Sequence, residues 1–367
     1  MGWDCRKERA GSPGRARPAD WREVGWVGDE VDETDVLLLD ALHVNPRATF
    51  ERLGSVLGIS PATAGRRWER LAGAGRAWVS SVPGPAVAMT GAIVEAEAVP
   101  GQTEAVGRAL AASRHVASVY LTAGAFDLQA LVLAADMPSL ASLVFDHLPT
   151  APGLARMHAH VGTAWYSKVR WRLGAISGGE AHSVRDDDGA TSDNDGQLAG
   201  TRTYDETDHA LYLALQHDGR ARYRDLAREL GTSEQLVRRR MTSLGRRGML
   251  TFRTDFTRGE GGWPAQIMFW LTVPDAALDV AGAEISGWRE TRICMAVVGR
   301  ANVFVMLQLH HLGELSGLYE RLAAVLPQAR IADQRVVLRP VKSWGRVLDR
   351  AGHATGVVPV DPWAPVG

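Results

Sequence analysis

Two stretches of the chain repeat the same order of apolar and polar positions. Residues 32–81 begin DETDVLLLDALHVNPRATFERLGSVLGIS, and residues 205–254 begin DETDHALYLALQHDGRARYRDLARELGTS. They align without a gap at an offset of 173 residues and share 17 identities in 50 positions. An internal repeat of this kind indicates a duplicated structural unit, so the chain is expected to contain the same fold twice.

The pattern at the start of each repeat predicts three short helices. In the first repeat Asp32 suits the N-cap of the first helix, the second runs from Thr49 to Gly58, and Ser60 begins the third. A Gly-x-Ser turn between the second and third helices is typical of a helix-turn-helix unit. The apolar side chains of the third helices that are expected in the core are Trp68, Leu71, Met241 and Leu244.

The remainder of each repeat predicts strand, helix, strand, strand, helix and strand. The segments are 92–98, 103–113, 116–122, 127–134, 138–148 and 154–164 in the first repeat, and 266–272, 276–286, 291–298, 302–309, 312–325 and 329–338 in the second. This βαββαβ order is the ferredoxin-like arrangement. The strands of the second repeat are strongly apolar, so we expect sheets buried against each other, either within one chain or between chains.

The expected fold class is α+β, with two repeats that each join a winged-helix-like helix-turn-helix domain to a ferredoxin-like βαββαβ domain. Residues 177–202 are rich in Gly, Ser and Asp, which is typical of a linker. The predicted boundaries are 1–30 for a flexible tail, 31–82 and 90–176 for the first two domains, 177–203 for the linker, 204–256 and 264–349 for the second two domains, and 350–367 for a tail.

Composition agrees with a globular protein. Of the 367 residues, 46% are hydrophobic and 23% charged, and no apolar run approaches the roughly 18–20 residues of a membrane helix. The first residues are charged and lack the apolar core of a secretory signal. Cys5 and Cys294 are too few for a disulfide framework, which favours the reducing cytoplasm.

Arginines gather on the third helix of each repeat, the helix that a helix-turn-helix unit places in the major groove of DNA. Guanidinium groups there reach guanine edges or phosphates. Such a helix face can also be merely solvated, but the turn, the cap and the duplication favour double-stranded DNA as the partner. The expected DNA contacts are Ser60, Thr63, Arg66, Arg67 and Arg70 in the first repeat and Ser233, Gln235, Arg238, Arg239 and Arg240 in the second.

The two helix-turn-helix units carry unequal charge. Six basic residues balance six acidic ones over 32–81, whereas ten arginines face seven acidic residues over 205–254. The second unit should therefore contribute more of the phosphate-driven affinity, with a steeper dependence on salt. Unequal recognition helices also imply an asymmetric operator. Within the set, Arg66, Arg238 and Arg239 are the expected base readers.

Together with the α/β segments, GISPATAGRRWERLAGAG, GTSEQLVRRRMTSLGRRG and TAGAFDLQALV resemble the Lrp/AsnC (feast/famine) family of regulators. The resemblance spans roughly residues 31–176 and 204–349. It implies a transcription regulator whose α/β domains form a homo-oligomer and sense a small molecule, often an amino acid. Most members carry one unit, so the tandem form departs from the family pattern and leaves the number of subunits open.

The same resemblance implies an effector site at the turn after the second strand of each α/β domain. The residues it designates are Gly124, Phe126 and Asp127 in the first repeat and Gly299 and Asn302 in the second. Since the second repeat lacks the carboxylate that could hold an ammonium group, an amino-acid effector is expected at the first. The alternative is that Gly124 only forms a tight hairpin and Asp127 only caps a strand.

Chemical motifs give little support to an enzyme. His158 and His160 share a face of one strand, but no third metal ligand is placed by spacing, so neither a metal nor a cofactor is expected. The chain lacks a phosphate loop of the expected form and a nucleophile elbow. Siroheme decarboxylases resemble this regulator family and can be fused pairs, so they remain an alternative. A DNA-free sensor or partner protein with decayed helix-turn-helix units is a third hypothesis, which the neutral first unit leaves open.

Overall fold

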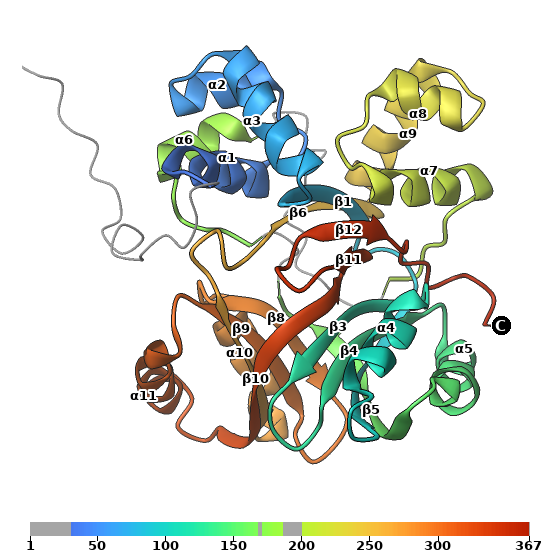
Figure 1. The fold of residues 1–367 in the computed structure, drawn as a ribbon, viewed down its shortest axis with the longest axis vertical. Helices are drawn as coiled ribbons and strands as arrows, with labels where there is room; N and C mark the ends of the chain where they lie inside the picture. Colours follow the sequence, from blue (N-terminus) through green and yellow to red (C-terminus); the bar gives the residue numbers. More distant parts are fainter. Residues whose placement is uncertain (1–30, 168–170, 186–199, 367) are drawn as a thin grey trace, which may run out of the picture.

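The computed structural model describes residues 31–167, 171–185 and 200–366, and these ranges form the two expected repeats. The predicted tail over 1–30 lies outside the described residues. Within the described ranges, no helix is long and apolar enough to cross a membrane. In Figure 1 the two helix-turn-helix units occupy one end of the molecule, and the two α/β domains occupy the other.

Each helix-turn-helix unit has the three predicted helices followed by one strand. The first unit comprises α1 (Glu33–Val44), α2 (Phe50–Leu57), α3 (Pro61–Gly73) and β1 (Ala77–Pro83), and the second comprises α7 (Glu206–His217), α8 (Tyr223–Glu229), α9 (Glu234–Arg246) and β6 (Leu250–Phe256). Asp32 caps α1 in a capping box with Asp35, as the sequence indicates. The four predicted core residues of α3 and α9 are all buried, which confirms the expected helix phase.

The strands β1 and β6 join the two helix-turn-helix units. They pair antiparallel along their full length, from Ala77 opposite Phe256 to Pro83 opposite Leu250. The apolar side chains of both units, of this ribbon and of residues 171–184 form one continuous core. The two recognition helices are therefore parts of a single packed body.

The α/β domains each contain the predicted ferredoxin-like elements. In the first these are β2 (Thr90–Ala98), α4 (Thr103–Ala112), β3 (Val116–Thr122), β4 (Leu128–Ala134), α5 (Met137–Ser142) and β5 (Leu154–Trp165). In the second they are β7 (Ala265–Thr272), α10 (Leu278–Ser286), β8 (Thr291–Val297), β9 (Val303–Leu309), α11 (Leu315–Val325) and β10 (Arg330–Ser343). Short π- or 3-10 turns flank α5, α10 and α11.

The last strand of each α/β domain crosses into the other domain. The strand β5 pairs with β2 and then, from Gly162, with β8, while β10 pairs with β7 and then, from Val337, with β3. These exchanges join the strands into a closed ring in the order β10, β3, β4, β2, β5, β8, β9, β7. The sequence left open whether the two sheets pair within or between chains, and in this structure they pair within one chain.

Burial on both faces explains why the strands are so apolar. Along β9, Val303, Val305 and Leu307 pack under the helices of their own domain, whereas Phe304 and Met306 face the other sheet. Helices α4 and α5 cover the outside of the first sheet, and α10 and α11 cover the second (Figure 1). The two sheets thus enclose a shared apolar core between them.

Two segments predicted as linker and tail are in part ordered, which corrects the sequence analysis. Residues Gly178–Val184 form α6, capped by Ser177 and Glu180 in a capping box, with Val184 buried against the first helix-turn-helix unit. At the other end of the chain, β12 (Ala354–Val357) lies within the predicted tail and pairs with β11 (Arg346–Leu348), and Val360 is buried. Composition missed both segments because main-chain and capping hydrogen bonds, rather than a run of apolar residues, hold them.

Candidate nucleic-acid interface and ligand sites

The recognition helices α3 and α9 begin at equivalent serines. The Oγ atom of Ser60 accepts a hydrogen bond from Thr63 N at 3.1 Å, and that of Ser233 accepts one from Leu236 N at 3.2 Å. Both hydroxyl groups thus have a capping role in the free protein. Both serines and Gln235 lie on the exposed surface, and Thr63 is half-buried, so the predicted contacts at the start of each helix are accessible.

Two of the predicted DNA-binding arginines have partners within their own unit. Arg67 Nη1 lies 2.7 Å from Asp32 Oδ2 and 2.8 Å from Asp35 Oδ1. The equivalent Arg240 makes the same pair of contacts, with Asp205 at 2.8 Å and Asp208 at 2.7 Å. Hydrogen bonds to Asp205 and Asp208 raise the pKa of Arg240 above its ordinary value. These arginines tie the recognition helix to the first helix of the unit, a role that sequence reasoning missed.

The remaining arginines of the set are exposed. Arg70 pairs with Asp35 but keeps 45% of its side chain accessible. Arg66 lies within 3.5 Å of Thr63 Oγ1, and Arg238 lies over the Tyr223 ring and 3.6 Å from Glu234. Arg239 is exposed and has no hydrogen bond or ion pair to any residue that the structure describes. The three expected base readers are therefore all available to a ligand.

The turns predicted as effector sites hold their polar side chains against neighbouring backbone. Asp127 Oδ2 accepts a hydrogen bond from Ala98 N at 2.9 Å, and Asn302 Oδ1 accepts one from Val273 N at the same distance. These are equivalent positions in the two repeats. Gly124 has φ +124°, a conformation that favours glycine. The alternative, in which Gly124 forms a tight hairpin and Asp127 caps a strand, is thus consistent with the conformation and the contacts of these two residues.

Charged and aromatic side chains surround the turn of the first repeat. The Arg335 guanidinium lies over the Phe126 ring at 4.7 Å, and the His158 ring approaches its edge at 5.4 Å. A Cβ atom added to Gly124 would lie 3.1 Å from Arg335 Cγ. The corresponding atom at Gly299 would lie 3.2 Å from His160 Nδ1. Each turn therefore faces the exchanged strand, β10 or β5.

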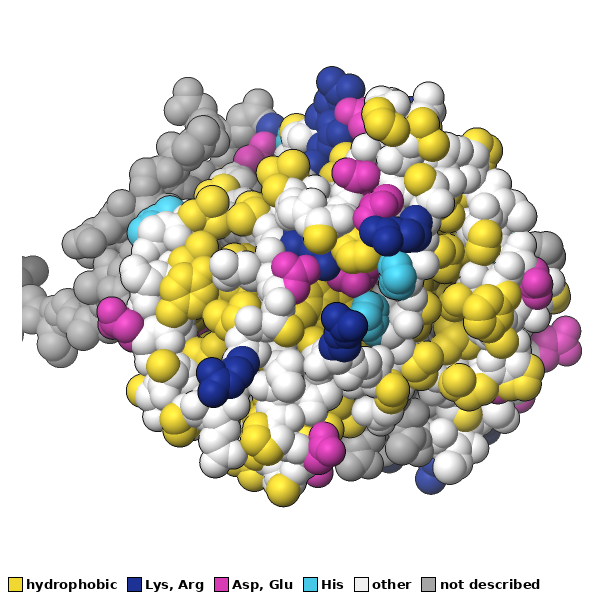
Figure 2. All heavy atoms as spheres, turned by 90° about the horizontal axis from the view of Figure 1, so that it is seen from below, with side chains coloured by type: hydrophobic (Ala, Val, Ile, Leu, Met, Phe, Trp, Pro, Cys, Tyr) yellow, Lys and Arg dark blue, Asp and Glu magenta, His cyan; other side chains and the backbone are white. Residues whose placement is uncertain are grey.

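Beside these turns lies a buried ionic cluster that the sequence analysis did not find. Glu95 receives a hydrogen bond from Arg335 and lies 2.9 Å from His160 Nε2. Arg335 also pairs with Asp333, and the His160 ring packs on Trp270 at 4.4 Å. Figure 2 shows the end of the molecule opposite the helix-turn-helix units, where acidic, basic and histidine side chains gather amid apolar surface. The available signals were Glu95 and Glu97 inside the apolar strand of 92–98, and His160, which the sequence analysis considered only as a metal ligand.

Family comparisons agree with this geometry. The AsnC-type helix-turn-helix domain matches residues 31–72 and 205–244, and the Lrp/AsnC ligand binding domain matches residues 91–164. The chain therefore contains helix-turn-helix domains of the AsnC type and a ligand binding domain of the Lrp/AsnC type. Two helix-turn-helix matches in one chain fit the tandem form that the internal repeat predicts.

Lrp/AsnC relatives correspond to one repeat. An uncharacterized HTH-type transcriptional regulator of Pyrococcus abyssi is 25% identical over 142 residues, which cover 38% of this chain and 89% of the relative. A similarly described regulator of Pyrococcus horikoshii is 24% identical over 143 residues, with the same coverage. Each of these relatives therefore has about the length of one repeat of this chain.

One solved structure is similar over both repeats. The siroheme decarboxylase NirDL aligns with a TM-score of 0.53 and covers 85% of this chain and 93% of its own. The sequences are only 14% identical, so the similarity concerns the fold. The two chains therefore share their overall fold across both repeats.

Proposed function

We propose that this protein is a sequence-specific transcription regulator of the Lrp/AsnC type in which one chain supplies both DNA-reading units. The observation that carries the proposal is the placement of α3 and α9 at the same end of the molecule, on units joined by the β1–β6 ribbon. Dimeric helix-turn-helix proteins read two half-sites with paired recognition helices. Here a single chain presents both helices.

The two units differ, and this difference belongs to the proposal. Arg238 and Arg239 are both exposed on α9, whereas α3 has a buried glycine, Gly65, at the position equivalent to Arg238. The proposed operator is therefore asymmetric, and its stronger half-site is read by α9. Ser60, Thr63, Arg66 and Gln235 complete the proposed base and backbone contacts, and Arg67, Arg70 and Arg240 act from their ion pairs as phosphate contacts.

A small-molecule effector such as an amino acid is proposed at the turn of the first repeat. Asp127 uses Oδ2 to cap the strand, which leaves Oδ1 to accept a hydrogen bond from an ammonium group. In the second repeat Asn302 offers no charge. Support for a site on the first repeat is thus the carboxylate itself, together with Phe126 and Arg335 beside it.

The proposal further places the protein in the cytoplasm, where a regulator meets DNA, and keeps a homo-oligomer as its working form. The single described cysteine, Cys294, is free and buried, which suits a reducing compartment. Light scattering of the purified chain would give the number of copies. The expected building block of this oligomer is a single chain rather than an obligatory dimer, because both halves of the closed sheet come from the same chain.

A gel-shift titration with the DNA upstream of the gene tests the regulator proposal. The protein should shift this DNA in the presence of nonspecific competitor, with an affinity that falls as salt is raised from about 50 to 200 mM. Arg238→Ala with Arg239→Ala should weaken binding and relax sequence preference. Arg246→Ala with Arg247→Ala is the matched control, because these exposed arginines lie at the far end of α9. An identical loss in both variants would contradict base reading by Arg238 and Arg239.

The enzyme alternative has one specific observation in its favour, the shared arrangement of both repeats with the siroheme decarboxylase. A structure of that enzyme holds an iron-uroporphyrin III analogue. A spectroscopic titration of the present protein with iron uroporphyrin III tests this alternative directly. Tight binding together with no specific DNA shift would favour a decarboxylase-like function, and the opposite pair of results supports the regulator.

A further inference from the structure

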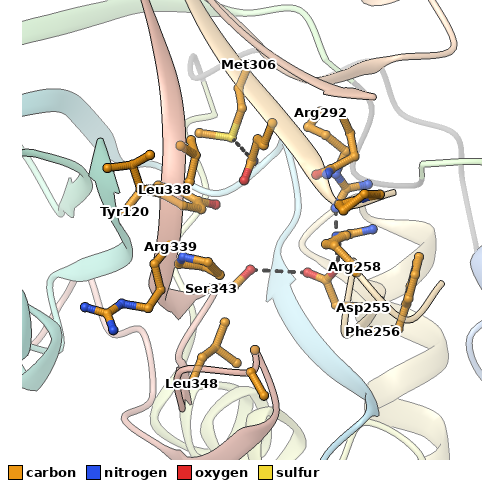
Figure 3. A pocket seen from close by; sticks show the side chains of 18 of the residues that line it. Tyr120, Asp255, Phe256, Arg258, Arg292, Met306, Leu338, Arg339, Ser343 and Leu348 are labelled. Carbon is orange, nitrogen blue, oxygen red and sulfur yellow. Dashed lines mark hydrogen bonds and ion pairs between the residues drawn. The ribbon is translucent and has the colours of Figure 1, made fainter. Parts of the chain in front are cut away.

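A cavity lies between the ribbon that joins the two helix-turn-helix units and the closed sheet below it. It encloses about 210 Å³. Its walls come from β6, β8, β9, β10 and the residues around β11, and Figure 3 shows it from close by. Arg258, Arg292 and Asp255 lie on one side, and Tyr120 and Leu338 lie on the other.

Three arginines in this wall share one carboxylate. Arg253 Nε lies 2.9 Å from Asp255 Oδ2, Arg258 pairs with Oδ1, and Arg292 Nη2 lies 3.5 Å from Oδ1. The side chains of Arg253, Arg258 and Arg292 are 9%, 18% and 4% exposed, and that of Asp255 is 2% exposed. A single negative charge therefore faces three positive charges that have little contact with water.

Among the residues that the structure describes, no acidic side chain other than Asp255 forms an ion pair with these three arginines. Trp171 packs on the guanidinium groups of Arg258 and Arg292 at 4.8 and 4.6 Å, and a ring cannot neutralise them. The guanidinium of Arg339 points away from the cavity toward α4, where it pairs with Glu104 (Figure 3).

Two donors of the cluster lack a hydrogen-bond acceptor among the described residues. These are Nη1 of Arg258 and Nη2 of Arg292. Burial, followed by repulsion among the neighbouring guanidinium groups, lowers the pKa of Arg258 well below its ordinary value. An excess of buried positive charge is costly, so a site that places three guanidinium groups around one carboxylate is expected to have a compensating anion.

We propose that this cavity binds a small organic anion whose carboxylate or phosphate group contacts Arg258 and Arg292. Guanidinium groups bind both of these oxyanions through paired hydrogen bonds. The rest of the cavity is largely apolar, with Ile293, Met306 and Leu338 among its lining residues. The ligand therefore carries an apolar body beside its acidic group. This site is distinct from the turn at Gly124, and its binding activity does not depend on the proposed function.

The position of the cavity also links the ligand to the DNA-reading end, an extension that rests on the proposed function. Arg253 and Arg258 belong to β6 and the turn after it, and β6 is one strand of the joining ribbon. Thr254, also on β6, donates a hydrogen bond from its hydroxyl to Leu42 O of α1 at 2.7 Å. A ligand that neutralises the arginines therefore acts on the element that fixes the two recognition helices relative to each other.

Calorimetry and thermal denaturation of the full chain test the site. The probes are 4-phenylbutyrate, phenyl phosphate, citrate and inorganic phosphate at constant ionic strength, with 4-phenylbutyramide as the neutral control. At least one organic anion should bind and raise the melting midpoint by about 2–4 °C at saturation, and the amide should do neither. The comparison of 4-phenylbutyrate with phenyl phosphate shows whether the site prefers a carboxylate or a phosphate group. Equal binding of phenyl phosphate and inorganic phosphate contradicts the apolar part of the proposal.

Variants separate a ligand site from a purely structural cluster. Arg292→Met should weaken anion binding at least tenfold and raise the melting midpoint without ligand, because it removes an uncompensated buried charge. Arg339→Met, whose guanidinium points elsewhere, should bind as the wild type does. If Arg292→Met does not fold, Arg258→Met takes its place. Absence of binding by all the anions, or unchanged binding in the Arg292 and Arg258 variants, overturns the proposal.

The link to DNA is measured separately. DNA affinity with and without the binding anion should differ at least threefold for the wild type and not for Arg292→Met. An anion that binds without altering DNA affinity contradicts the link alone. Failure of the protein to bind any specific DNA contradicts the proposed function, while calorimetry still decides the anion site.

Discussion

Arg47 and Arg220 occupy equivalent positions in the two repeats, and each donates hydrogen bonds to the main chain of the other repeat. Arg47 donates to the carbonyl oxygens of Gly219 and Ala221, at 2.5 and 3.0 Å. Arg220 donates to those of Pro46 and Ala48, at 2.6 and 2.8 Å. The two units are thus joined by a reciprocal pair of contacts related by the internal symmetry of the chain.

Replacing Arg220 with Ala should destabilise the protein by about 2–4 kcal/mol, because it leaves two carbonyl oxygens without their charged donor. Arg220→Lys should restore little, since an ammonium group does not reproduce the planar fork. Burial, and then the nearby charge of Arg47, lower the pKa of Arg220 to about 10. The double Arg47→Ala, Arg220→Ala variant should therefore lose less than the sum of the single losses. Urea denaturation measures the loss of unfolding free energy in each variant, with the exposed Arg224→Ala as the control. If the loss in the double variant equals the sum of the two single losses, the two arginines are not coupled.

Equivalent arginines allow a comparison of the two DNA-reading helices. Arg239→Ala should weaken DNA binding and relax the preference for the base that it reads, by about 1–3 kcal/mol. Arg66→Ala, at the same position of the neutral first unit, should have the smaller effect. Fluorescence anisotropy with the bound DNA and with single-base variants of it measures both effects. A larger loss for Arg66→Ala would mean that α3 is the dominant reader.

Asp127→Asn should leave stability unchanged within about 0.5 kcal/mol. The reason is that Asn302 already forms the same strand-end hydrogen bond in the second repeat. If an ammonium-bearing effector binds at this turn, however, the variant should lose it because the charge is gone. Denaturation paired with calorimetry against a panel of amino acids makes the measurement. A marked loss of stability would show that the carboxylate itself, and not its position, holds the turn.

Lys342 predicts a dependence of stability on pH. Its side chain is fully buried, its Nζ donates to Ser113 O at 2.9 Å, and burial lowers its pKa to about 7. Between pH 7 and the ordinary lysine pKa of 10.5 the folded protein holds a neutral lysine and the unfolded chain a charged one. The free energy of unfolding therefore rises with pH across that window. Above it both states hold a neutral lysine, and the cost of burying the charge is gone.

Lys342→Met removes the titrating group. The variant should be more stable than the wild type at pH 7, by an amount on the order of 1–3 kcal/mol after the lost hydrogen bond is included. The advantage should shrink as the pH approaches 10. Denaturation of both proteins at pH 7 and pH 9.5 provides the test. A difference that does not change with pH would mean that Lys342 stays charged in the fold.

The cores of the two recognition helices should respond alike to truncation. Leu71 and Leu244 are equivalent residues with 0% and 1% of their surface exposed. Replacing either with Ala should cost about 2–5 kcal/mol through lost burial and the cavity left behind. Because the two units share one core, we expect a single cooperative unfolding transition for both variants in denaturant. Two separate transitions would show that the units unfold independently.

Local sequence patterns predicted the helices and strands because the same capping residues and the same spacing of apolar residues occur in both repeats. The Asp32 and Ser60 caps, the Gly58 terminus and the βαββαβ order follow from neighbouring residues, and these are confirmed. The sequence analysis ended the last strand at residue 338, because a proline usually interrupts a strand. In the structure β10 continues to Ser343, and Pro340 lies at an irregularity in the pairing with β3. Such crossings depend on a strand from the other repeat, which local patterns do not record.

The site residues divide in the same way. Helix phase found the exposed Arg66, Arg238 and Arg239, but it could not show that Arg67 and Arg240 turn back to acidic residues 32 to 35 positions earlier. The arginine cavity was invisible because Arg253 and Arg292 lie 39 residues apart, in a strand of the ribbon and a strand of the sheet. Only the packing of the ribbon on the closed sheet brings them to one carboxylate.

The exchange of β5 and β10 within one chain changes how the protein responds to its own abundance. A regulator assembled from two separate subunits loses active dimers on dilution, so its operator occupancy at low expression falls with roughly the square of subunit concentration. When the partners are covalently joined, the second half is always present at a high effective concentration. In the proposed regulator, each chain therefore carries both reading units at any dilution, and the pairing of the two units requires no encounter between separate chains.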